Sequence, residues 1–399
     1  MLAFESASNG IIDTKQAVES AILAASAGHS AADCRLVALH LTMGHDHNAV
    51  LQSVRKHCPK ARIIGCTCAG VIGREGANES MRAIAVMLVF GEAHEVLMTY
   101  VEHLDGSNSD IAAAKLARDL VKQSGKPKFV MLLASGIDVD ANKAIAGIES
   151  VLGDDITIFG GTSADNMKGI ASYQFVDDSV HEHAAMLVGF FDPSLEVYTQ
   201  ASHGFTPAAV ELTVTKSTGN RVHQIAGEPA WRSFTRHLGQ PETAKPGDTI
   251  PSGAVGIRLS DADAEEYGDS HILRVITHSE ADGTFLMPVT CPAGTKLSLM
   301  HRDEARIFRN LDVMMRQILA ACGTKKIVAV FHADCGARGR LTLDRVTKEE
   351  IVRAMQKPLA VNGKVSAWLG MYGFGEFARL GGRNQFHNYT TSLYVITRA

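Results

Sequence analysis

The N-terminal half of the chain contains two segments in which an apolar strand, a helical pattern and a glycine-containing turn follow in the same order. In the first, the apolar run 36–39 precedes a helical pattern and then Ile-Gly-Cys-Thr-Cys-Ala-Gly at 64–70. In the second, the run 129–133 precedes a helical pattern and then Phe-Gly-Gly-Thr-Ser-Ala-Asp at 159–165. A duplication of this kind predicts repeated strand–helix–strand units. We expect these units to form mixed sheets flanked by helices, in an α/β to α+β fold.

A weaker third copy lies near the C-terminus. The apolar run 328–331 precedes a helical pattern that starts at Thr347, and Trp-Leu-Gly-Met-Tyr-Gly-Phe-Gly follows at 368–375. A last apolar run covers 389–396, as an apolar run also follows the turn in each of the first two copies. The sequence therefore predicts up to three units of one kind.

The glycines of these turns have two interpretations. Glycine lets a backbone approach a ligand closely and tolerates positive φ, but the same glycines can simply make tight exits from buried strands. No G-x-x-x-x-G-K-[ST] pattern is present, and Gly70 with Gly73 lacks the rest of a dinucleotide fingerprint, so nucleotide binding is not predicted. Equivalent strands end at equivalent places, and ligands gather outside strand ends. We therefore expect the turns to converge on one pocket, with Gly65 and Thr67 superposing on Gly160 and Thr162. The ligand-binding residues predicted here are Gly65, Thr67, Gly160, Gly161 and Thr162.

Composition excludes several classes of protein. The 399 residues carry a formal net charge of −4 and no long run of Lys or Arg, which does not favour nucleic-acid binding. No apolar stretch reaches the roughly 18 residues needed to span a bilayer, and the N-terminus, which includes Glu5, does not resemble a secretory signal. We expect a cytoplasmic protein that binds neither nucleic acid nor membrane.

The seven cysteines form no C-x-x-C pair. This spacing argues against a disulfide framework, a zinc finger and the C-x-x-C-H attachment of c-type haem. Two H-x-H pairs, His45 with His47 and His181 with His183, would suit a metal if they lay on strands, but no third ligand is identifiable from the spacing.

These motifs resemble the FIST family, whose members have an N-terminal and a C-terminal FIST domain. The N-terminal resemblance rests on the motifs at 64–70 and 159–165. The C-terminal resemblance rests on four features in order: Phe331 with Cys335-x-x-Arg338-Gly339, Pro358-Leu359, Gly370 with Tyr372-Gly373 and Gly375-Glu376, and His387-Asn388-x-Thr390. The resemblance implies two FIST-type domains at 31–225 and 226–399, preceded by a helical lead-in at 1–30.

The family resemblance implies a sensor of small ligands in intracellular signal transduction. Some stand-alone bacterial members of the family are similar to haem-binding nitric oxide sensors that control a separate histidine kinase. No output segment is recognisable in this chain. We therefore expect a stand-alone sensor that binds a small molecule and has no enzymatic activity. Its candidate cofactor is haem, and its candidate partner is a histidine kinase.

The C-terminal motifs supply the second set of predicted ligand-binding residues: Cys335, Arg338, Glu376, His387, Asn388 and Thr390. A guanidinium from Arg338 or Arg340 would stabilise a Cys335 thiolate, although a buried cysteine can also pack as a small hydrophobe. Glu376 would pair with Arg338 or with a ligand amine, or would be a solvated loop acid. His387 is the predicted axial ligand of haem, or a structural histidine that satisfies loop backbone.

Two alternatives from other classes remain open at this stage. One is a cysteine-dependent enzyme in which Cys335 and His387 act as nucleophile and base. The other is a protein-interaction scaffold without a ligand. No G-x-S-x-G elbow is present, so the sequence does not favour a serine hydrolase.

Overall fold

The computed structural model describes residues 1–26 and 28–398, and it contains three units with the same order of elements. The first unit consists of β1 (Ala3–Asn9), α1 (Thr14–Ala25), β2 (Leu36–Leu41), α2 (His47–His57), β3 (Arg62–Thr67), β4 (Gly70–Gly73), β5 (Gly76–Asn78) and β6 (Ile84–Phe90). The second consists of β7 (Val96–Val101), α3 (Ser109–Ser124), β8 (Phe129–Ala134), α4 (Ala141–Leu152), β9 (Thr157–Thr162), β10 (Gln174–Val176), β11 (Ser179–His181) and β12 (Ala185–Phe190). The third consists of β13 (Leu195–Ser202), α8 (Glu304–Cys322), β22 (Lys326–Cys335), α9 (Arg345–Gln356), β23 (Trp368–Gly373), β24 (Gly375–Leu380), β25 (Arg383–His387) and β26 (Thr391–Arg398).

The three units build three six-stranded sheets with one strand order. The orders are β1-β6-β2-β3-β10-β11, β7-β12-β8-β9-β24-β25 and β13-β26-β22-β23-β4-β5. In each sheet one pair is parallel (β2 with β3, β8 with β9, β22 with β23), and the other pairs are antiparallel. The outer hairpin of each sheet comes from another unit: β4–β5 extends the third sheet, β10–β11 the first, and β24–β25 the second. The units are therefore interlocked in a cycle, and the predicted third copy is present.

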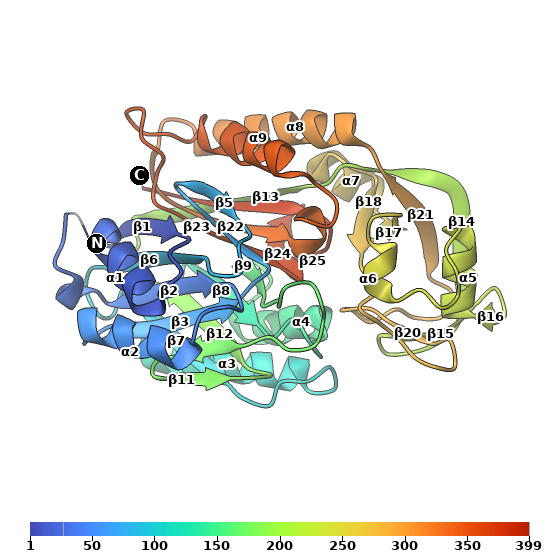
Figure 1. The fold of residues 1–399 in the computed structure, drawn as a ribbon, viewed down its shortest axis with the longest axis horizontal. Helices are drawn as coiled ribbons and strands as arrows, with labels where there is room; N and C mark the ends of the chain where they lie inside the picture. The colour runs from blue at the N-terminus through green and yellow to red at the C-terminus, as the bar shows by residue number, and fades with distance from the viewer. Residues whose placement is uncertain (27, 399) are drawn as a thin grey trace.

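The inner faces of the three sheets share one core. Apolar side chains from all three sheets meet there, including Ile64, Phe159 and Phe331, and the rings of Phe159 and Phe331 have centroids 5.5 Å apart. The outer face of each sheet is covered by its own pair of helices, α1 and α2, α3 and α4, or α8 and α9 (Figure 1). This is the expected arrangement of mixed sheets flanked by helices.

Aspartate residues set the start of five of these helices. The carboxylates of Asp13, Asp46, Asp140, Asp303 and Asp344 each accept a hydrogen bond from the backbone N–H three residues later. Such caps satisfy backbone donors that have no partner inside the helix. The last of these helices, α9, begins after Asp344 rather than at the predicted Thr347.

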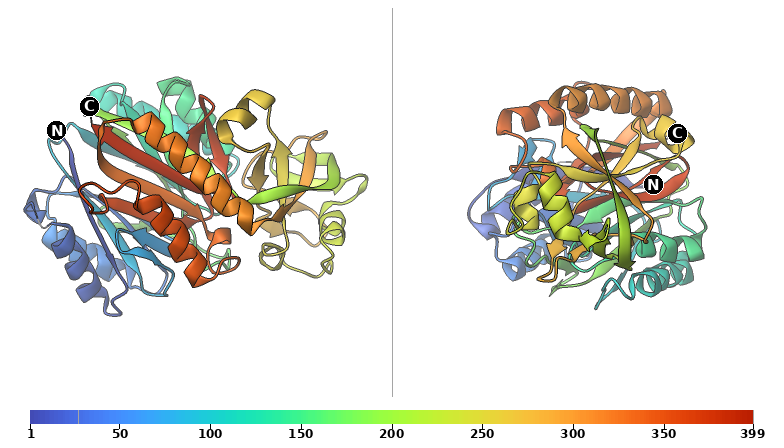
Figure 2. Two further views of the ribbon diagram at one scale, coloured as in Figure 1. Left: turned by 90° about the horizontal axis from the view of Figure 1, so that it is seen from above. Right: turned by 90° about the vertical axis from the view of Figure 1, so that its right-hand side faces the viewer.

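A segment of about a hundred residues is inserted into the third unit, between β13 and α8. It contains β14 (Phe205–Thr218), β15 (Arg221–Ile225), β16 (Glu228–Pro229), α5 (Ala230–His237), α6 (Pro246–Thr249), β17 (Ala254–Arg258), α7 (Asp261–Tyr267), β18 (His271–Arg274), β19 (His278–Ser279), β20 (Phe285–Leu286) and β21 (Lys296–Arg302). Its strands form a fourth sheet in the order β18-β17-β21-β14-β15-β20-β19, which packs on a core of its own. We call this segment the inserted domain. It stands at one end of the three-sheet core (Figures 1 and 2).

The predicted domain limits lie inside the first unit and inside the inserted domain. Residues 1–30 hold α1, but β1 precedes it and forms the edge of the first sheet. The limit between 225 and 226 lies inside the inserted domain, between β15 and β16.

Among the helices that the structure describes, none has both the length and the apolar character needed to cross a membrane.

Candidate functional site

A cavity of about 300 Å³ lies where the inserted domain meets the core. The core contributes the segments after β8 (136–139) and β9 (167–169), and residues at the carboxyl ends of β22 (Cys335 and Ala337) and β23 (373–374). The inserted domain contributes residues from α6 and from the segments 275–278 and 286–288. We call this space the seam cavity. It lies at the carboxyl ends of parallel strands, where ligands of open α/β sheets are found.

The seam cavity has an apolar wall and a polar rim. Ile250, Ile276, Met287 and Ala337 are among the apolar lining residues. Lys168, His183, His278 and Asp138 are exposed at the rim. Cavities of this size that combine apolar walls with a few polar groups are typical of small-molecule sites.

Cys335 is the one predicted site residue that lines the seam cavity. Its backbone N–H donates to the carbonyl of Thr390, and the equivalent bonds in the other units run from Thr42 to Ala83 and from Ser135 to Ala184. Cys335 is therefore the third-unit counterpart of a threonine and a serine. Burial and then the nearby Glu376 raise the pKa of its thiol, so it is a thiol rather than a thiolate at neutral pH.

The arginines predicted to activate Cys335 are directed elsewhere. Nε of Arg338 donates to Oδ1 of Asp334 at 2.9 Å, inside the protein. Burial opposes ionisation of Asp334, but Arg338 and then His332 outweigh it and lower the pKa of Asp334. Arg340 donates to the carbonyls of Ala69 and Glu79. The predicted arrangement of a thiolate beside a guanidinium is therefore not present.

Glu376 is fully buried on β24, directly opposite Gly161 on β9 and His387 on β25. Its Oε2 accepts a hydrogen bond from Oγ1 of Thr390 at 2.6 Å. Burial raises the pKa of Glu376 well above its usual range. The predictions of a solvated loop acid and of an ion pair with Arg338 are both wrong, because this carboxyl lies inside a sheet and Arg338 pairs with Asp334.

His387 is 1% exposed and packs against Tyr267, with ring centroids 5.6 Å apart. Neither of its ring nitrogens has a hydrogen-bond partner among the described residues. Burial, reinforced by Arg274 and His203, lowers the pKa of His387 to about 3. Arg274 lies beside it, because its Nη1 donates to the carbonyl of Phe386 at 2.7 Å.

Glu376, His387, Tyr267 and Arg274 make up an internal polar cluster between the core and the inserted domain. Each is at least nine-tenths buried, and each has a polar atom without a partner among the described residues. Unpaired buried polar atoms cost about 1–3 kcal/mol each, so such a grouping is rarely there for packing alone. Cys335 lies close enough to Glu376 for that carboxyl to raise the pKa of its thiol, and it also lines the seam cavity, so it connects this cluster to the cavity.

Asn388 ties the core to the inserted domain next to this cluster. Its Nδ2 donates to the carbonyl of Phe374 at 3.0 Å, and its Oδ1 accepts from the N–H of Val275 at 3.3 Å. Phe374 lines the seam cavity from the core, and Val275 lines it from the inserted domain. Asn388 therefore fixes one side of the cavity relative to the other.

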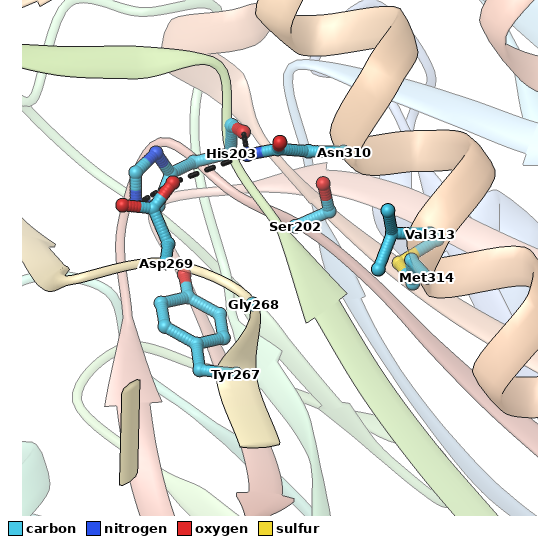
Figure 3. A pocket seen from close by; sticks show the side chains of 8 residues that line it. All are labelled: Ser202, His203, Tyr267, Gly268, Asp269, Asn310, Val313 and Met314. Atoms are coloured by element: carbon cyan, nitrogen blue, oxygen red, sulfur yellow. Dashed lines mark hydrogen bonds and ion pairs between the residues drawn. The ribbon is translucent and has the colours of Figure 1, made fainter. Parts of the chain in front are cut away.

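A second contact between the two parts surrounds Asp269 (Figure 3). Its Oδ2 accepts from Arg306 at 3.0 Å and from Asn310 at 3.1 Å, and it lies 3.4 Å from Nε2 of His203. A cavity of about 10 Å³, the size of one water, adjoins these residues and Tyr267. This buried carboxylate of the inserted domain is held by donors that belong to α8 and to the connection after β13.

The predicted glycine and threonine residues lie inside strands rather than on the cavity wall. Gly65 is opposite Leu39 and Gly160 is opposite Leu132, so these two positions are equivalent, as are Thr67 and Thr162. A Cβ on Gly65 or Gly160 would lie 2.1 or 2.2 Å from the carbonyl oxygen opposite. Oγ1 of Thr67 accepts from Tyr173, and Oγ1 of Thr162 contacts the carbonyl of Gly375, so both hold the exchanged hairpins. The expected superposition is confirmed, and tight strand packing explains the glycines.

The H-x-H pairs were candidate metal ligands in the sequence. No three His, Cys, Asp or Glu side chains in the described part of the chain are placed to hold a metal ion. His45 contacts Thr14 and His47 begins α2, so this pair does not lie on a strand.

Three residues of the polar contacts, Tyr267, Asp269 and Arg274, were not predicted from the sequence. Arg274 within the apolar run 272–276 was a signal, because a charge inside such a run needs a partner.

Comparison with known proteins finds distant similarities to a curated relative and to solved structures. The chain is 25% identical to an uncharacterised protein of Methanocaldococcus jannaschii over 205 residues, which are 48% of this chain and 38% of that protein. The chain thus matches less than half the length of this curated relative. Two solved structures of cyanuric acid hydrolase, one of them from A. caulinodans, align over 100% of both chains, at 10% identity and TM-scores of 0.38 and 0.35. Scores this low do not establish a common fold.

The sequence matches two domain families in succession. Residues 35–228 match the FIST N domain, and residues 230–379 match the FIST C domain. Together the two matches leave only the ends of the chain outside. The chain therefore belongs to the FIST family and contains both a FIST N and a FIST C domain.

Proposed function

We propose that this protein is a sensor that binds a small ligand in the seam cavity and reports the binding to a separate signalling protein. FIST domains are associated with sensing in signal transduction, which supports the sensor class. The observation that carries the proposal is that the core and the inserted domain both contribute walls to one cavity of about 300 Å³. A ligand held between two parts favours the arrangement in which both contact it.

The lining of the cavity supports a ligand class. An apolar wall with Lys168, His183 and His278 at its rim favours a molecule with an apolar body and an anionic group. Asp138 at the same rim would contribute selectivity against anions that approach from its side.

Two contacts between the parts support transmission of the binding event. Asn388 bridges the two walls of the cavity, and Asp269 is held at the base of the inserted domain by Arg306 and Asn310. A ligand that shifts Val275 against Phe374 would act on the Asn388 bridge directly. The proposed output is a changed position of the inserted domain, recognised by a partner such as a histidine kinase.

A haem-based nitric oxide sensor is the narrower form of this proposal. His387 does not fit as an axial ligand for haem in the seam cavity, because it is 1% exposed and does not line that cavity. His183, His278 and Met167 are side chains of suitable type that do line it. The haem form of the proposal therefore rests on these residues.

We propose no catalytic reaction for this site. An enzyme with Cys335 as nucleophile would need an activated thiol, whereas burial raises the pKa of this one. A catalytic turnover that is measured in the wild type and lost in Cys335→Ala would favour the alternative of a cysteine-dependent enzyme.

A thermal-shift screen of small metabolites tests the proposal. Compounds that raise Tm are then measured with Val275→Trp, which fills the cavity, and with Ile257→Trp, which alters a similarly half-buried position on β17 of the inserted domain, outside the cavity. A ligand of the cavity loses its effect only in Val275→Trp. Candidate kinases whose autophosphorylation does not respond to the protein, with or without such a compound, would exclude the proposed partner.

A further inference from the structure

Three side chains with soft or borderline metal-binding atoms meet in the middle of the three-sheet core. Sγ of Cys66 on β3 lies 3.4 Å from Nδ1 of His40 on β2 and 3.5 Å from Sδ of Met371 on β23. All three residues are buried, with exposed fractions of 4% for His40, 0% for Cys66 and 1% for Met371. His40 and Cys66 are register neighbours in one sheet, and Met371 reaches them from another.

The repeat of the fold explains why these residues meet. Gly65, Gly160 and Gly370 are equivalent, because each faces a close backbone approach from the parallel strand beside it. The next residues, Cys66, Gly161 and Met371, therefore occupy equivalent positions on the opposite, inner faces of the three sheets.

Gly161 makes the room that Met371 occupies. A Cβ at Gly161 would lie 2.7 Å from Cε of Met371, so any larger side chain in the second unit would displace the thioether. Two of the three equivalent positions thus bring the thiol of Cys66 and the thioether of Met371 into contact. Gly161, at the remaining position, leaves them space.

Cys66 has one hydrogen and two neighbours that can accept it. Its thiol cannot donate to Nδ1 of His40 and to Sδ of Met371 at the same time. A metal ion that replaced the thiol hydrogen would have Nδ1 of His40 and Sδ of Met371 as its candidate further ligands, because both lie next to Sγ of Cys66. At a tetrahedral angle, a nitrogen and a sulfur ligand at about 2.0 and 2.3 Å from one metal are about 3.5 Å apart, close to the 3.4 Å between Nδ1 of His40 and Sγ of Cys66. Two sulfur ligands at about 2.3 Å are about 3.8 Å apart, so Sδ of Met371, at 3.5 Å from Sγ, would move by a few tenths of an ångström on metal binding.

We propose that His40, Cys66 and Met371 form a binding site for one Cu(I) ion. Thiolate and thioether ligands select Cu(I), and the set contains no carboxylate that would favour a harder ion. On binding, the S–H bond of Cys66 breaks, the proton leaves to solvent, and a bond from Sγ to copper forms without any change of oxidation state. The site uses a methionine, so it is distinct from any grouping of His, Cys, Asp and Glu alone.

The protonation of the residues is compatible with this site. Burial lowers the pKa of His40 to about 3, so its imidazole is neutral and free to bind a metal at neutral pH. Burial raises the pKa of the Cys66 thiol, so the site without metal carries no charge. Release of the thiol proton makes copper binding stronger as pH rises.

The core position of the site has a kinetic consequence. The metal reaches it only through local opening of the strands around it, so loading is slow compared with diffusion. Titrations must therefore be incubated to equilibrium.

The experiment is competition for Cu(I) between the full-length protein and a chromogenic Cu(I) chelator under anaerobic, reducing conditions. We expect one tight equivalent. Cys66→Ser, Met371→Leu and His40→Leu should each weaken it by more than about 100-fold, beyond what changes in outer-shell groups cost. X-ray absorption of the loaded protein should give a shell of one nitrogen and two sulfurs.

Two cysteine variants serve as matched controls. Cys68 is fully buried on the same chain segment, but its thiol donates to the carbonyl of Leu41, so Cys68→Ser should keep the tight equivalent. Cys58 lies beside Cys34 in another core, and Cys58→Ser tests whether that thiol pair holds the metal instead. Loss of tight binding in Cys58→Ser, or unchanged binding in folded Met371→Leu and His40→Leu, overturns the proposal, as does an absorption shell without sulfur.

Discussion

Glu376 and His387 lie directly opposite each other on β24 and β25, and both are sealed from solvent. The first is an acid whose pKa is raised, and the second is a base whose pKa is lowered. Burial therefore disfavours the charged form of both side chains. Because the pKa of Glu376 is raised and the pKa of His387 is lowered, we expect these two residues to make the stability of the fold depend on pH in two separable ways.

Glu376→Gln should reduce the loss of stability that accompanies a rise of pH above about 5. The folded pKa of Glu376 is above the unfolded value of about 4.3, so its stabilising effect is complete below that value and is lost as pH rises through the folded pKa. A glutamine keeps the shape and can still accept from Thr390. The difference in unfolding free energy between variant and wild type, measured in urea, should shift in favour of the variant from pH 5 to pH 8. A difference independent of pH would mean that Glu376 is not held neutral.

His387→Phe should reduce the loss of stability in acid. The folded pKa of about 3 is below the unfolded value of about 6.5, so stability is fully present above pH 6.5 and falls as pH drops toward 3. Between pH 7 and pH 5 the wild type should lose about 2 kcal/mol relative to the variant, at about 1.4 kcal/mol for each pH unit below 6.5. Equal acid sensitivity of the two proteins would show that His387 takes up its proton while folded.

Gly160→Ala should destabilise the fold by more than about 2 kcal/mol. The residue has φ of 125°, and a Cβ would lie 2.2 Å from the carbonyl oxygen of Leu132. Gly106→Ala is the control, because no atom lies within 4 Å of its added Cβ. Chemical denaturation compares the two variants, and equal stabilities would contradict the packing explanation for the glycine motif.

A haem titration tests the nitric oxide form of the proposed function. We expect His387→Ala to retain any saturable Soret band of the wild type, because His387 does not line the seam cavity. His183→Ala or His278→Ala should shift the band, since both side chains lie at the cavity rim. A wild-type protein that gives only the spectrum of free haem would remove haem from the account.

The fold was largely predictable from the sequence because its strands are apolar and recur in one order. The duplication at Gly65 and Gly160, and its weaker copy at Gly370, identified three strand–helix–strand units, whose two strands pair in parallel in the structure. The exchange of hairpins between sheets was not predictable, since β4, β10 and β24 carry no signal for the sheet they join. The inserted domain was not recognised as an insertion, because its strands read like those of the units.

The site was only partly predictable. The motif around Cys335 identifies a residue that lines the cavity, but the predicted pairing of this cysteine with Arg338 is wrong. Arg338 points to Asp334 because a buried carboxylate needs a paired charge, which sequence order does not reveal. Tyr267 and Arg274 reach the cluster from more than a hundred residues away.

Binding of a small apolar anion to the seam cavity is the measurement that tests the proposed function most directly. The fluorescence of 8-anilinonaphthalene-1-sulfonate is titrated against folded wild type, Val275→Trp and Ile257→Trp. We predict saturable binding to the wild type and to Ile257→Trp, and affinity lower by about tenfold or more in Val275→Trp, whose indole fills space that an apolar ligand needs. Equal affinity of all three proteins, or no saturable binding to the wild type, would contradict a ligand site between the core and the inserted domain.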